Sequence, residues 1–301
     1  MTEPVVEINN LSRQFGRTLA LNQVNFTAER GQVYGLVGAN GAGKTTLIKH
    51  MLGLLRCHSG SVRVFGRDPT LDPIEVLRQL GYLSEERDIP DWMTITELMN
   101  YTQAFYPKWD PAYATELLDT FALDPAKQIR HLSRGMRAQV ALIAAVAYRP
   151  ELLILDEPSS GLDAIVRKDI LNAIVRTISE EGRTVIFSSH FLEEVERLSD
   201  HVTMIQQGRI VLDASLDALR ESHHHSQLHF ANPLAAAPEL AGLLSVTGEG
   251  RYWSAVHTCT PEQLNATLAI AGGSVAESRY ANLEEIFVSR VGRVRNEDIA
   301  A

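Results

Sequence analysis

Short apolar runs alternate along the chain with longer segments whose apolar residues recur at helical spacing. Gln32–Val37 and Leu152–Leu155 have the length and composition of buried strands, whereas Thr45–Leu55 shows the periodicity of a helix. The strands expected before residue 207 are Val5–Ile8, Val24–Ala28, Gln32–Val37, Ser61–Phe65, Leu152–Leu155, Thr184–Ser188 and Val202–Gln206. Strands that alternate with helices such as Ala164–Ser179 and Phe191–Leu198 predict an α/β fold with a parallel sheet and helices on its faces.

The middle of the chain, from Pro73 to Ala147, is dominated by helical patterns. Apolar residues recur at helical spacing in Thr94–Phe105, Pro111–Phe121 and Ser133–Ala147. These helices stand between the strands of the first half and those of the second half of the expected sheet. We therefore expect a helical subdomain, at residues 86–148, inserted into the α/β core.

The segment Arg220–Ser226 is polar and is expected to be a linker. The pattern beyond it predicts strands Gln227–Phe230, Leu244–Thr247, Tyr252–His257 and Ser274–Tyr280, and helices Pro238–Leu244, Pro261–Ala271 and Leu283–Val291. Up to the last strand, this order is that of a ferredoxin-like βαββαβ unit. We expect two domains, residues 1–220 and 221–301, of which the second is a small α+β accessory module.

The composition is that of an ordinary globular protein and excludes several functions. Of the 301 residues, 45% are hydrophobic and 22% are charged, which excludes a disordered chain. The formal net charge of -9 argues against binding to nucleic acid. The N-terminus has no secretory signal pattern, and the longest apolar run, Val140–Tyr148, is shorter than the roughly 20 residues that span a bilayer. We expect a cytoplasmic protein without direct membrane insertion, in which Cys57 and Cys259 are reduced.

A glycine-rich loop follows the run Gln32–Val37. Residues 38–45 read GANGAGKT and fit the pattern G-x-x-x-x-G-K-[ST] between a buried strand and a helix. Glycines let consecutive backbone N–H groups turn toward phosphate oxygens, and the helix presents its positive end to the same anion. We expect Lys44 to reach the β- and γ-phosphates and Thr45 to ligate Mg²⁺. The expected contacts to a nucleoside triphosphate are Gly38, Ala39, Asn40, Gly41, Ala42, Gly43, Lys44, Thr45 and Thr46.

Two acidic residues follow the apolar run Leu152–Leu155. A strand buried on both faces brings Asp156 to the carboxyl edge of the sheet, where it can hold Mg²⁺ through water. Glu157 can polarise a water for in-line attack on the γ-phosphate. His190 follows the strand Thr184–Ser188 and can hydrogen-bond the γ-phosphate or position the attacking water. The alternatives are a solvated strand end for the acids and a structural role for the histidine.

These motifs, in this order, resemble those of the nucleotide-binding subunit of ABC transporters over about residues 5–220. Leu132–Met136 resembles the family signature LSGGQ, and Ser160–Asp163 resembles the D-loop. Phe15 resembles the aromatic residue that stacks on adenine, with a core position as its alternative. The resemblance implies an ATP hydrolase with a P-loop NTPase core, which binds ATP and Mg²⁺ at the residues described above.

The resemblance also implies a site shared between subunits. In this family two subunits, either two copies or two homologous ATPase chains, pack head to tail around two ATP molecules. The signature of one subunit faces the γ-phosphate held by the other, so Ser133 and the N–H of Gly135 would act in trans. The implied nucleotide contacts on this side are Ser133, Arg134, Gly135, Met136 and Asp163.

The chain departs from the family pattern in two places. The signature has Arg134 where glycine is usual and Met136 where glutamine is usual. Arg134 either meets phosphate or ribose or is a solvated surface charge. Glu85 stands where the family usually has glutamine, and it can still ligate Mg²⁺ although it adds negative charge beside the γ-phosphate. These variants, together with Leu283–Phe287, resemble the branch of ABC subunits paired with small integral permeases, which are often exporters.

The histidine run His223–His225, with His229 nearby, is a weak candidate for a metal site. No acid or cysteine completes a ligand set, and the run lies in the expected linker. We therefore expect these histidines to be solvated.

Aromatic residues of the helical subdomain are open to two interpretations. They are either core residues or part of the groove that receives a permease helix in this family. The residues concerned are Trp92, Tyr101, Phe105 and Tyr106. If they form the groove, charge reversal at Arg87 or truncation of Trp92 should uncouple transport and leave basal hydrolysis largely intact.

The interpretation that fits best is an ATP-hydrolysing subunit that dimerises on ATP and drives transport, with export as the expected direction, through a separate membrane permease. Such a subunit is cytoplasmic and lies on the inner face of the cell membrane through that permease. The alternative is a non-transport ABC ATPase that acts on the ribosome or DNA. Against it, the chain has one ATPase domain and no coiled-coil insertion between Lys44 and Ser133. A catalytically silent regulatory subunit is disfavoured because the expected catalytic residues are all present.

Overall fold

The computed structural model describes the backbone of residues 3–297 and, within that range, all side chains except those of residues 177–181 and 291–297. The chain divides into two compact units. The first comprises Met1–Phe191 with Leu198–Leu212, and the second comprises Leu192–Arg197 with Asp213–Ala301. The division after Leu212 comes earlier than residue 220, where the sequence pattern predicts the start of a linker.

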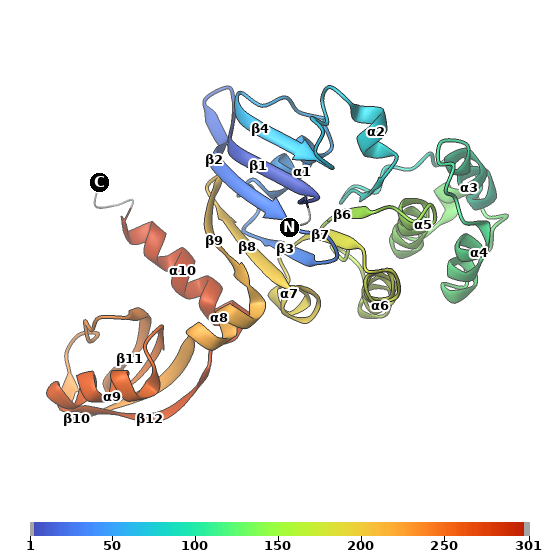
Figure 1. The fold of residues 1–301 in the computed structure, drawn as a ribbon. Coiled ribbons are helices and arrows are strands. Elements are labelled where there is room, and N and C mark those ends of the chain that lie inside the picture. Colours follow the sequence, from blue (N-terminus) through green and yellow to red (C-terminus); the bar gives the residue numbers. More distant parts are fainter. Residues whose placement is uncertain (1–2, 298–301) are drawn as a thin grey trace. The chain divides into compact units, whose positions relative to one another are not determined.

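The main sheet has six strands in the order β5-β6-β7-β3-β8-β9 (Figure 1). They are β5 (Leu80–Leu83), β6 (Leu152–Asp156), β7 (Thr184–Ser189), β3 (Val33–Val37), β8 (His201–Gln206) and β9 (Arg209–Ser215). The first five strands in this order pair in parallel. Every residue of β3, β6 and β7 is buried, as uninterrupted apolar runs predict. The α/β fold with a parallel sheet is therefore confirmed.

A second sheet of three antiparallel strands has the order β2-β1-β4. Its strands are β1 (Val6–Phe15), β2 (Thr18–Ala28) and β4 (Ser59–Val64). β1 and β2 are longer than predicted because backbone pairing continues, with shifts in register, into polar and exposed residues that break the alternation. Helix α1 (Lys44–Met51) shares one hydrophobic core with both sheets, for example through Leu11, Leu36 and Leu47.

Three α-helices and one short 3-10 helix form the segment between β5 and β6. They are α3 (Ile95–Gln103), α4 (Pro111–Thr120), η1 (Ile129–His131) and α5 (Arg134–Val146). Each α-helix begins after a residue whose side chain accepts a hydrogen bond from the backbone N–H three positions on: Thr94, Asp110 and Ser133. These caps mark the helix starts in the sequence. α3 and α4 pack against α5, which contacts β5 and α6 (Ala164–Glu181).

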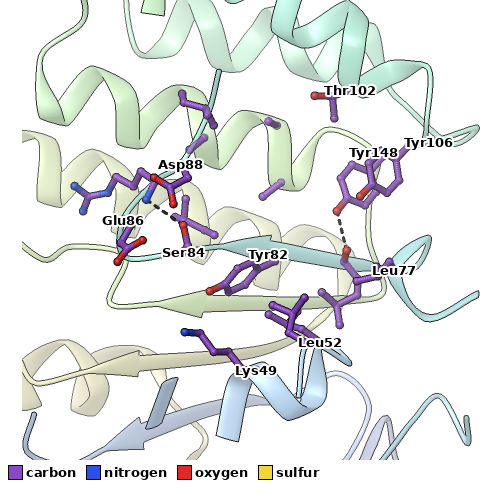
Figure 2. A pocket seen from close by; sticks show the side chains of 18 residues that line it. Lys49, Leu52, Leu77, Tyr82, Ser84, Glu86, Asp88, Thr102, Tyr106 and Tyr148 are labelled. Atoms are coloured by element: carbon purple, nitrogen blue, oxygen red, sulfur yellow. Dashed lines mark hydrogen bonds between the residues drawn. The ribbon is translucent and has the colours of Figure 1, made fainter. Parts of the chain in front are cut away.

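The sequence pattern missed two short elements ahead of these helices, α2 (Pro73–Leu77) and the strand β5. β5 has only four residues, too few to carry an alternating signal, yet it pairs with β6 at the edge of the sheet. The hydroxyl of Tyr148 donates to the carbonyl of Leu80 at 2.8 Å, and the ring of Tyr148 stacks on that of Tyr106 with 3.6 Å between ring centres (Figure 2). These contacts fasten the helical segment to the sheet edge.

The second unit is a three-stranded antiparallel sheet with helices, and not the ferredoxin-like βαββαβ unit that the sequence pattern predicts. α7 (Leu192–Leu198) precedes β8, and the chain later continues through α8 (Leu216–Ser222), β10 (His224–Leu234), β11 (Leu243–His257), α9 (Pro261–Ile270), β12 (Gly273–Tyr280) and α10 (Leu283–Glu297). The strand order is β11-β10-β12. The two strands expected at Leu244–Thr247 and Tyr252–His257 are one strand, β11.

Residues 238–244, which the structure describes, form irregular structure and the start of β11 instead of the expected helix. Gly242 takes a left-handed φ of 87°, which would interrupt a helix that runs on to residue 244. Leu240 packs against the core of this unit, which includes Phe230 and Trp253. Tertiary packing overrides the helical propensity of the segment.

The polar segment Arg220–Ser226 is not a linker, because it forms the end of α8 and the start of β10. His223, the residue between them, is 2% exposed. Its Nδ1 donates to the carbonyl of Leu219 at 3.0 Å, and its Nε2 lies 2.9 Å from Nη2 of Arg290. The expectation of a solvated histidine is therefore wrong for His223, which caps α8 and is enclosed there. In the described part of the chain, no three His, Cys, Asp or Glu side chains have the geometry of a metal site.

Candidate nucleotide site

The loop between β3 and α1 is shaped by close contacts on both sides. A Cβ atom at Gly38 would lie 2.4 Å from the carbonyl oxygen of Ile205, and one at Gly43 would lie 2.8 Å from that of Ala20. Gly43 also has a φ of 118° and Gly41 a φ of 80°, conformations that glycine adopts without strain. The loop therefore presents backbone rather than side chains, which suits an anion held by N–H groups and the start of a helix.

A cavity of about 470 Å³ lies over this loop. Its walls come from residues 39–46, from Thr18–Ala20 after the turn that joins β1 to β2, from Gln207–Gly208 between β8 and β9, and from Glu85 and Glu157. Ligand pockets have volumes of about 300–1,000 Å³. All of the phosphate-loop residues expected at a nucleotide, except Gly38, line this cavity.

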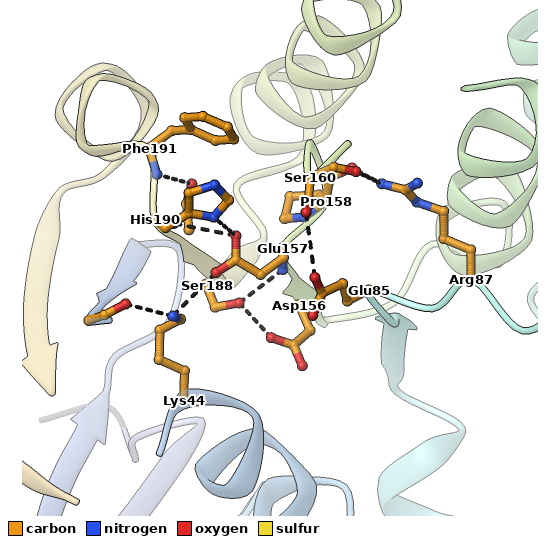
Figure 3. A network of polar contacts seen from close by, with 12 residues as sticks. Lys44, Glu85, Arg87, Asp156, Glu157, Pro158, Ser160, Ser188, His190 and Phe191 are labelled. Carbon is orange, nitrogen blue, oxygen red and sulfur yellow. Dashed lines mark hydrogen bonds and ion pairs between the residues drawn. The ribbon is translucent and has the colours of Figure 1, made fainter. Parts of the chain in front are cut away.

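Lys44, the first residue of α1, is buried beneath the cavity. Its Nζ donates to the carbonyl of Gly38 at 2.7 Å and lies 3.3 Å from Oε1 of Glu157 (Figure 3). A buried ammonium group needs such partners, since an unpaired buried charge is costly. The loop carbonyl and the carboxylate together hold the Lys44 charge where the phosphate loop meets the end of β6.

Polar groups at the carboxyl ends of β6 and β7 hold one another in place. Asp156 pairs in register with Ser188 of the neighbouring strand. The Ser188 hydroxyl donates to Oδ1 of Asp156 at 2.6 Å and accepts from the backbone N–H of Glu157 at 2.9 Å. Ser188 was missed at the sequence level, although a hydroxyl residue at the end of an apolar strand beside Asp156 is a signal for it.

Glu157 and His190 form a close pair. Glu157 has a left-handed φ of 49°, a conformation that costs a non-glycine residue about 1–2 kcal/mol. Its Oε2 accepts from Nδ1 of His190 at 2.7 Å and from the His190 backbone N–H at 3.3 Å. Because a carboxylate only accepts, Nδ1 carries a proton. The side chain of Glu157 is 6% exposed and that of His190 is 43% exposed, so the pair joins a buried carboxylate to a ring at the surface.

The oxygen atoms available to a cation lie around the same cavity. Thr45 is half-buried in its wall, Glu85 lines its rim, and Asp156 is buried at the sheet edge beside Glu157. Hydroxyl and carboxylate oxygens are the ligands that Mg²⁺ prefers, and Mg²⁺ commonly takes only one or two of them besides phosphate and water. This donor set fits Mg²⁺ that is bound together with a triphosphate.

The signature residues stand at the start of α5 and do not line the cavity as the structure describes it. Ser133 caps α5 by accepting from the N–H of Met136 at 3.2 Å, and Met136 itself is half-buried. Gly135 packs against the side chain of Val166, where a Cβ atom would come within 3.0 Å. Asp163 caps α6 by accepting from two backbone N–H groups at 3.0 Å. Ser133 is exposed and does not line the cavity over its own chain's phosphate loop.

The aromatic residues singled out by the sequence are mostly at the surface. Phe15 is 44% exposed at the end of β1, with the Arg13 guanidinium 4.7 Å from its ring centre, and is not a core residue. Trp92 is 64% exposed. Tyr101 and Phe105 are exposed too, whereas Tyr106 lines the groove described below.

Arg87 was expected at an accessible coupling surface, and the structure corrects this. The residue is 5% exposed, and its guanidinium donates to the carbonyls of Pro158 and Ser160. Charge reversal at Arg87 would place a carboxylate against two carbonyl oxygens. We therefore expect this variant to disturb the turn after Glu157, so that it would not act on coupling alone.

Comparison with known proteins gives the family. Residues 21–160 match the family described as "ABC transporter", and residues 126–196 match "AAA domain, putative AbiEii toxin, Type IV TA system". The chain is 28% identical to the ABC transporter ATP-binding protein YtrB of Bacillus subtilis (strain 168), over 97% of this chain and 99% of that protein. It is 32% identical to the daunorubicin/doxorubicin resistance ATP-binding protein DrrA of Streptomyces peucetius, over 79% of this chain and 76% of that protein. A solved ATP-binding subunit of an ABC transporter superposes with a TM-score of 0.66 at 28% identity, covering 72% of this chain and 92% of that one.

The chain belongs to the ATP-binding subunits of ABC transporters. It is an ATP-hydrolysing subunit that drives transport through a separate membrane permease, and subunits of this family dimerise. The similarity to YtrB covers nearly the whole of both chains, so the second unit is shared with that relative.

Proposed function

We propose that this chain hydrolyses ATP where the phosphate loop meets the ends of β6 and β7, and that hydrolysis drives export through the permease. The observation that carries the proposal is the convergence of Lys44 and His190 on the carboxylate of Glu157, at 3.3 and 2.7 Å. The name of the relative DrrA, a drug-resistance protein, supports export as the direction.

Glu157 acts as the general base. A water attacks the γ-phosphorus of ATP and gives a proton to Glu157, while the bond from the γ-phosphorus to the β,γ-bridging oxygen breaks to leave ADP and phosphate. The hydrogen bond from His190 fixes the orientation of the Glu157 carboxylate. Lys44, buried at the loop, supplies positive charge for the β- and γ-phosphates.

Mg²⁺ would be held by the hydroxyl of Thr45, by Asp156 and by Glu85. When bound, it neutralises charge on the β- and γ-phosphates. Ser188 orients Asp156 through the 2.6 Å hydrogen bond and so sets the direction from which this carboxylate approaches the cation.

The rest of the nucleotide is covered by a second subunit, either another copy of this chain or a homologue. Ser133 and the N–H of Gly135 of that subunit face the γ-phosphate, with Arg134, Met136 and Asp163 beside them. The exposed start of α5 supports this role, because the first N–H groups of a helix lack partners within the helix and attract anions. Phe15, exposed near the rim of the cavity, stacks on adenine.

A groove of about 540 Å³ is the seat for the permease. Its floor is largely apolar and comes from the residue after α1, from β5 and from α5: Leu52, Leu80, Leu83, Ala141, Ala144 and Ala145. Lys49 stands on one side, whereas Glu86 and Asp88 stand on the other (Figure 2). An amphipathic helix that carries an apolar face and charges of both signs fits these walls. Every helix in the described part of the chain is too short or too polar to cross a bilayer, and the permease would hold the chain on the inner face of the membrane.

The test is purification of the tagged full chain from membranes in wild-type and Glu157→Gln forms. The wild type should bring down a protein with several membrane-spanning segments and should hydrolyse ATP. Glu157→Gln keeps the size of the side chain but removes the base, so turnover should fall by about 10²- to 10⁴-fold. The variant should still bring down the permease and should accumulate as an ATP-bound dimer in size-exclusion chromatography.

Glu151→Gln is the matched control, since it makes the same change at an exposed ion pair with Arg30 and should hydrolyse ATP normally. Wild-type turnover in Glu157→Gln would refute the assignment of the base. Recovery of ribosomes, or of no membrane-spanning protein, would refute the transporter role.

A further inference from the structure

Arg87 is a buried arginine that joins two functional parts of the first unit. It lies in the loop 84–89, which forms one wall of the permease groove. A single nitrogen of its guanidinium, Nη2, donates to the carbonyl of Pro158 at 3.2 Å and to that of Ser160 at 2.8 Å. Both carbonyls belong to the turn directly after Glu157 (Figure 3). The side chain of Arg87 thus connects the groove to the turn that follows Glu157, the proposed base.

The backbone of the loop directs Arg87 inward. Arg87 has a left-handed φ of 54°, and its N–H donates to the carbonyl of Ser84 at 3.2 Å and to the Ser84 hydroxyl at 3.0 Å. The neighbouring residues Glu86 and Asp88 are exposed, whereas Arg87 is buried. The loop is therefore fixed at the position from which the guanidinium reaches the turn.

Glu85 and Arg134, which both depart from the family pattern, contact this same turn at 158–161. The Ser160 hydroxyl donates to Oε1 of Glu85 at 3.4 Å. A Cβ atom at Gly161 would lie 2.4 Å from Cζ of Arg134, so the guanidinium of Arg134 covers this glycine. The acidic departure at position 85 and the basic one at 134 thus contact the same turn that Arg87 binds.

We propose that Arg87 is a positioning residue for hydrolysis, which fixes the turn at 158–161 and so links the occupant of the groove to Glu157. The inference rests on the proposed roles of Glu157 as base and of the groove as permease seat. Arg87 does not line the nucleotide cavity as the structure describes it. Its loss should therefore act on turnover and spare nucleotide affinity, because a small misplacement of a catalytic group slows the chemical step.

The first experiment measures ATP hydrolysis by the full chain in three forms: wild type, Arg87→Met and Arg87→Lys. Arg87→Met keeps the length of the side chain but leaves the carbonyls of Pro158 and Ser160 without their donor, so its thermal midpoint should fall, and the kinetics are measured well below that midpoint. Its kcat should fall roughly 10- to 100-fold, while its KM for ATP stays within about twofold of the wild type. Arg87→Lys retains the charge and the donors and should recover part of the lost kcat.

The matched control is Arg78→Met, which removes an exposed arginine paired with Glu75 and should leave both constants unchanged. A role in packing alone predicts wild-type kcat in Arg87→Met, and that result would overturn the proposal. If Arg87→Met does not fold, Arg87→Lys and Arg87→Gln decide, because each retains a donor but alters the two hydrogen bonds to the turn, and an unchanged kcat in both overturns the proposal. Absence of hydrolysis in the wild type would instead refute the proposed function.

Hydrogen exchange tests directly whether Arg87 connects the loop 84–89 to the turn at 158–161. ATP should slow exchange in residues 38–46 of both the wild type and Arg87→Met, because both bind nucleotide. Residues 84–89 should become protected in the wild type alone, since Arg87→Met has lost the connection between this loop and the turn at 158–161. Equal protection of residues 84–89 in the two forms would overturn the proposal.

Discussion

His190 of the first unit and His257 of the second unit lie in opposite environments. In the first unit, Nδ1 of His190 bonds to the buried Glu157 beside the nucleotide cavity, and much of its ring reaches solvent. In the second unit, His257 is fully buried, with Nδ1 2.9 Å from the carbonyl of Cys259 and Nε2 2.8 Å from the Ser226 hydroxyl. His223 likewise bonds through both ring nitrogens. A histidine enclosed by partners on both sides supports the fold, whereas one that joins a buried carboxylate to a cavity rim is placed for chemistry.

Lys44→Ala should produce the largest difference between the two units, because it changes the nucleotide site of the first and leaves the second unaltered. The change removes a buried charge that faces the expected phosphates, so ATP affinity should fall by about 100-fold or more. Isothermal titration calorimetry measures this loss. The emission of Trp253, which is buried in the second unit, should stay unchanged.

The control is Lys49→Ala, on the same helix but facing the permease groove, which should bind ATP as the wild type does. ATP binding retained in Lys44→Ala would contradict the role of Lys44. A shift in Trp253 emission would contradict the independence of the units.

Acid should weaken the second unit through its buried histidines. Burial lowers the pKa of His223 and His257 below their ordinary 6.5, so the unfolded chain takes up protons at a higher pH than the folded unit. Their contribution is complete above about pH 6.5 and falls as the pH drops toward the lowered native pKa, by at most about 1.4 kcal/mol per pH unit for each histidine. Urea unfolding measures it through Trp253 emission in a chain with Trp92→Phe and Trp109→Phe.

Substituting His223 and His257 by glutamine in that reporter chain should flatten the dependence of unfolding free energy on pH between 6.5 and 5. The neutral amide takes up no proton in either state, so this slope is lost. A slope that persists unchanged would mean that other groups set the acid sensitivity of the second unit.

Truncation should have the smallest effect on the nucleotide site. A chain that ends at Ser222, the last residue of α8, retains every residue that lines the nucleotide cavity. Its ATP affinity should lie within about threefold of the full chain, because the removed residues supply no phosphate contact. Calorimetry on a folded truncated chain checks this, with circular dichroism as the control for folding. Loss of binding in the folded truncated chain would show that the second unit takes part in the site, whereas we expect it to regulate or help dimerise the subunit.

The sequence predicts best the features whose signal is local. The phosphate loop needs glycines at fixed spacing, β6 is an unbroken apolar run, and Thr94, Asp110 and Ser133 cap their helices within four residues. Each of these can be read without knowing what lies across the fold.

The remaining features depend on contacts between distant residues. β5 is a strand because it pairs with β6, which lies some seventy residues further along the chain. His223 is enclosed by Arg290 of α10, so a polar run in the sequence is a buried junction in the fold. The burial and the partners of Arg87 depend on carbonyls of the turn after β6, and no local pattern around Arg87 reveals this contact.

The phosphate loop is closely enclosed by its neighbours. A Cβ atom at Gly38 or Gly43 would collide with a neighbouring carbonyl, and the carbonyl of Ala42 accepts from the N–H of Gly208 at 2.9 Å. We expect a loop enclosed in this way between the β1–β2 and β8–β9 connections to keep its shape when nucleotide arrives or leaves. We expect the motion that drives the permease to begin instead at the loop 84–89, which Arg87 connects to the turn at 158–161. In mechanical terms, the phosphate loop is a fixed support, and the moving part is the loop 84–89 together with the turn that Arg87 ties to it.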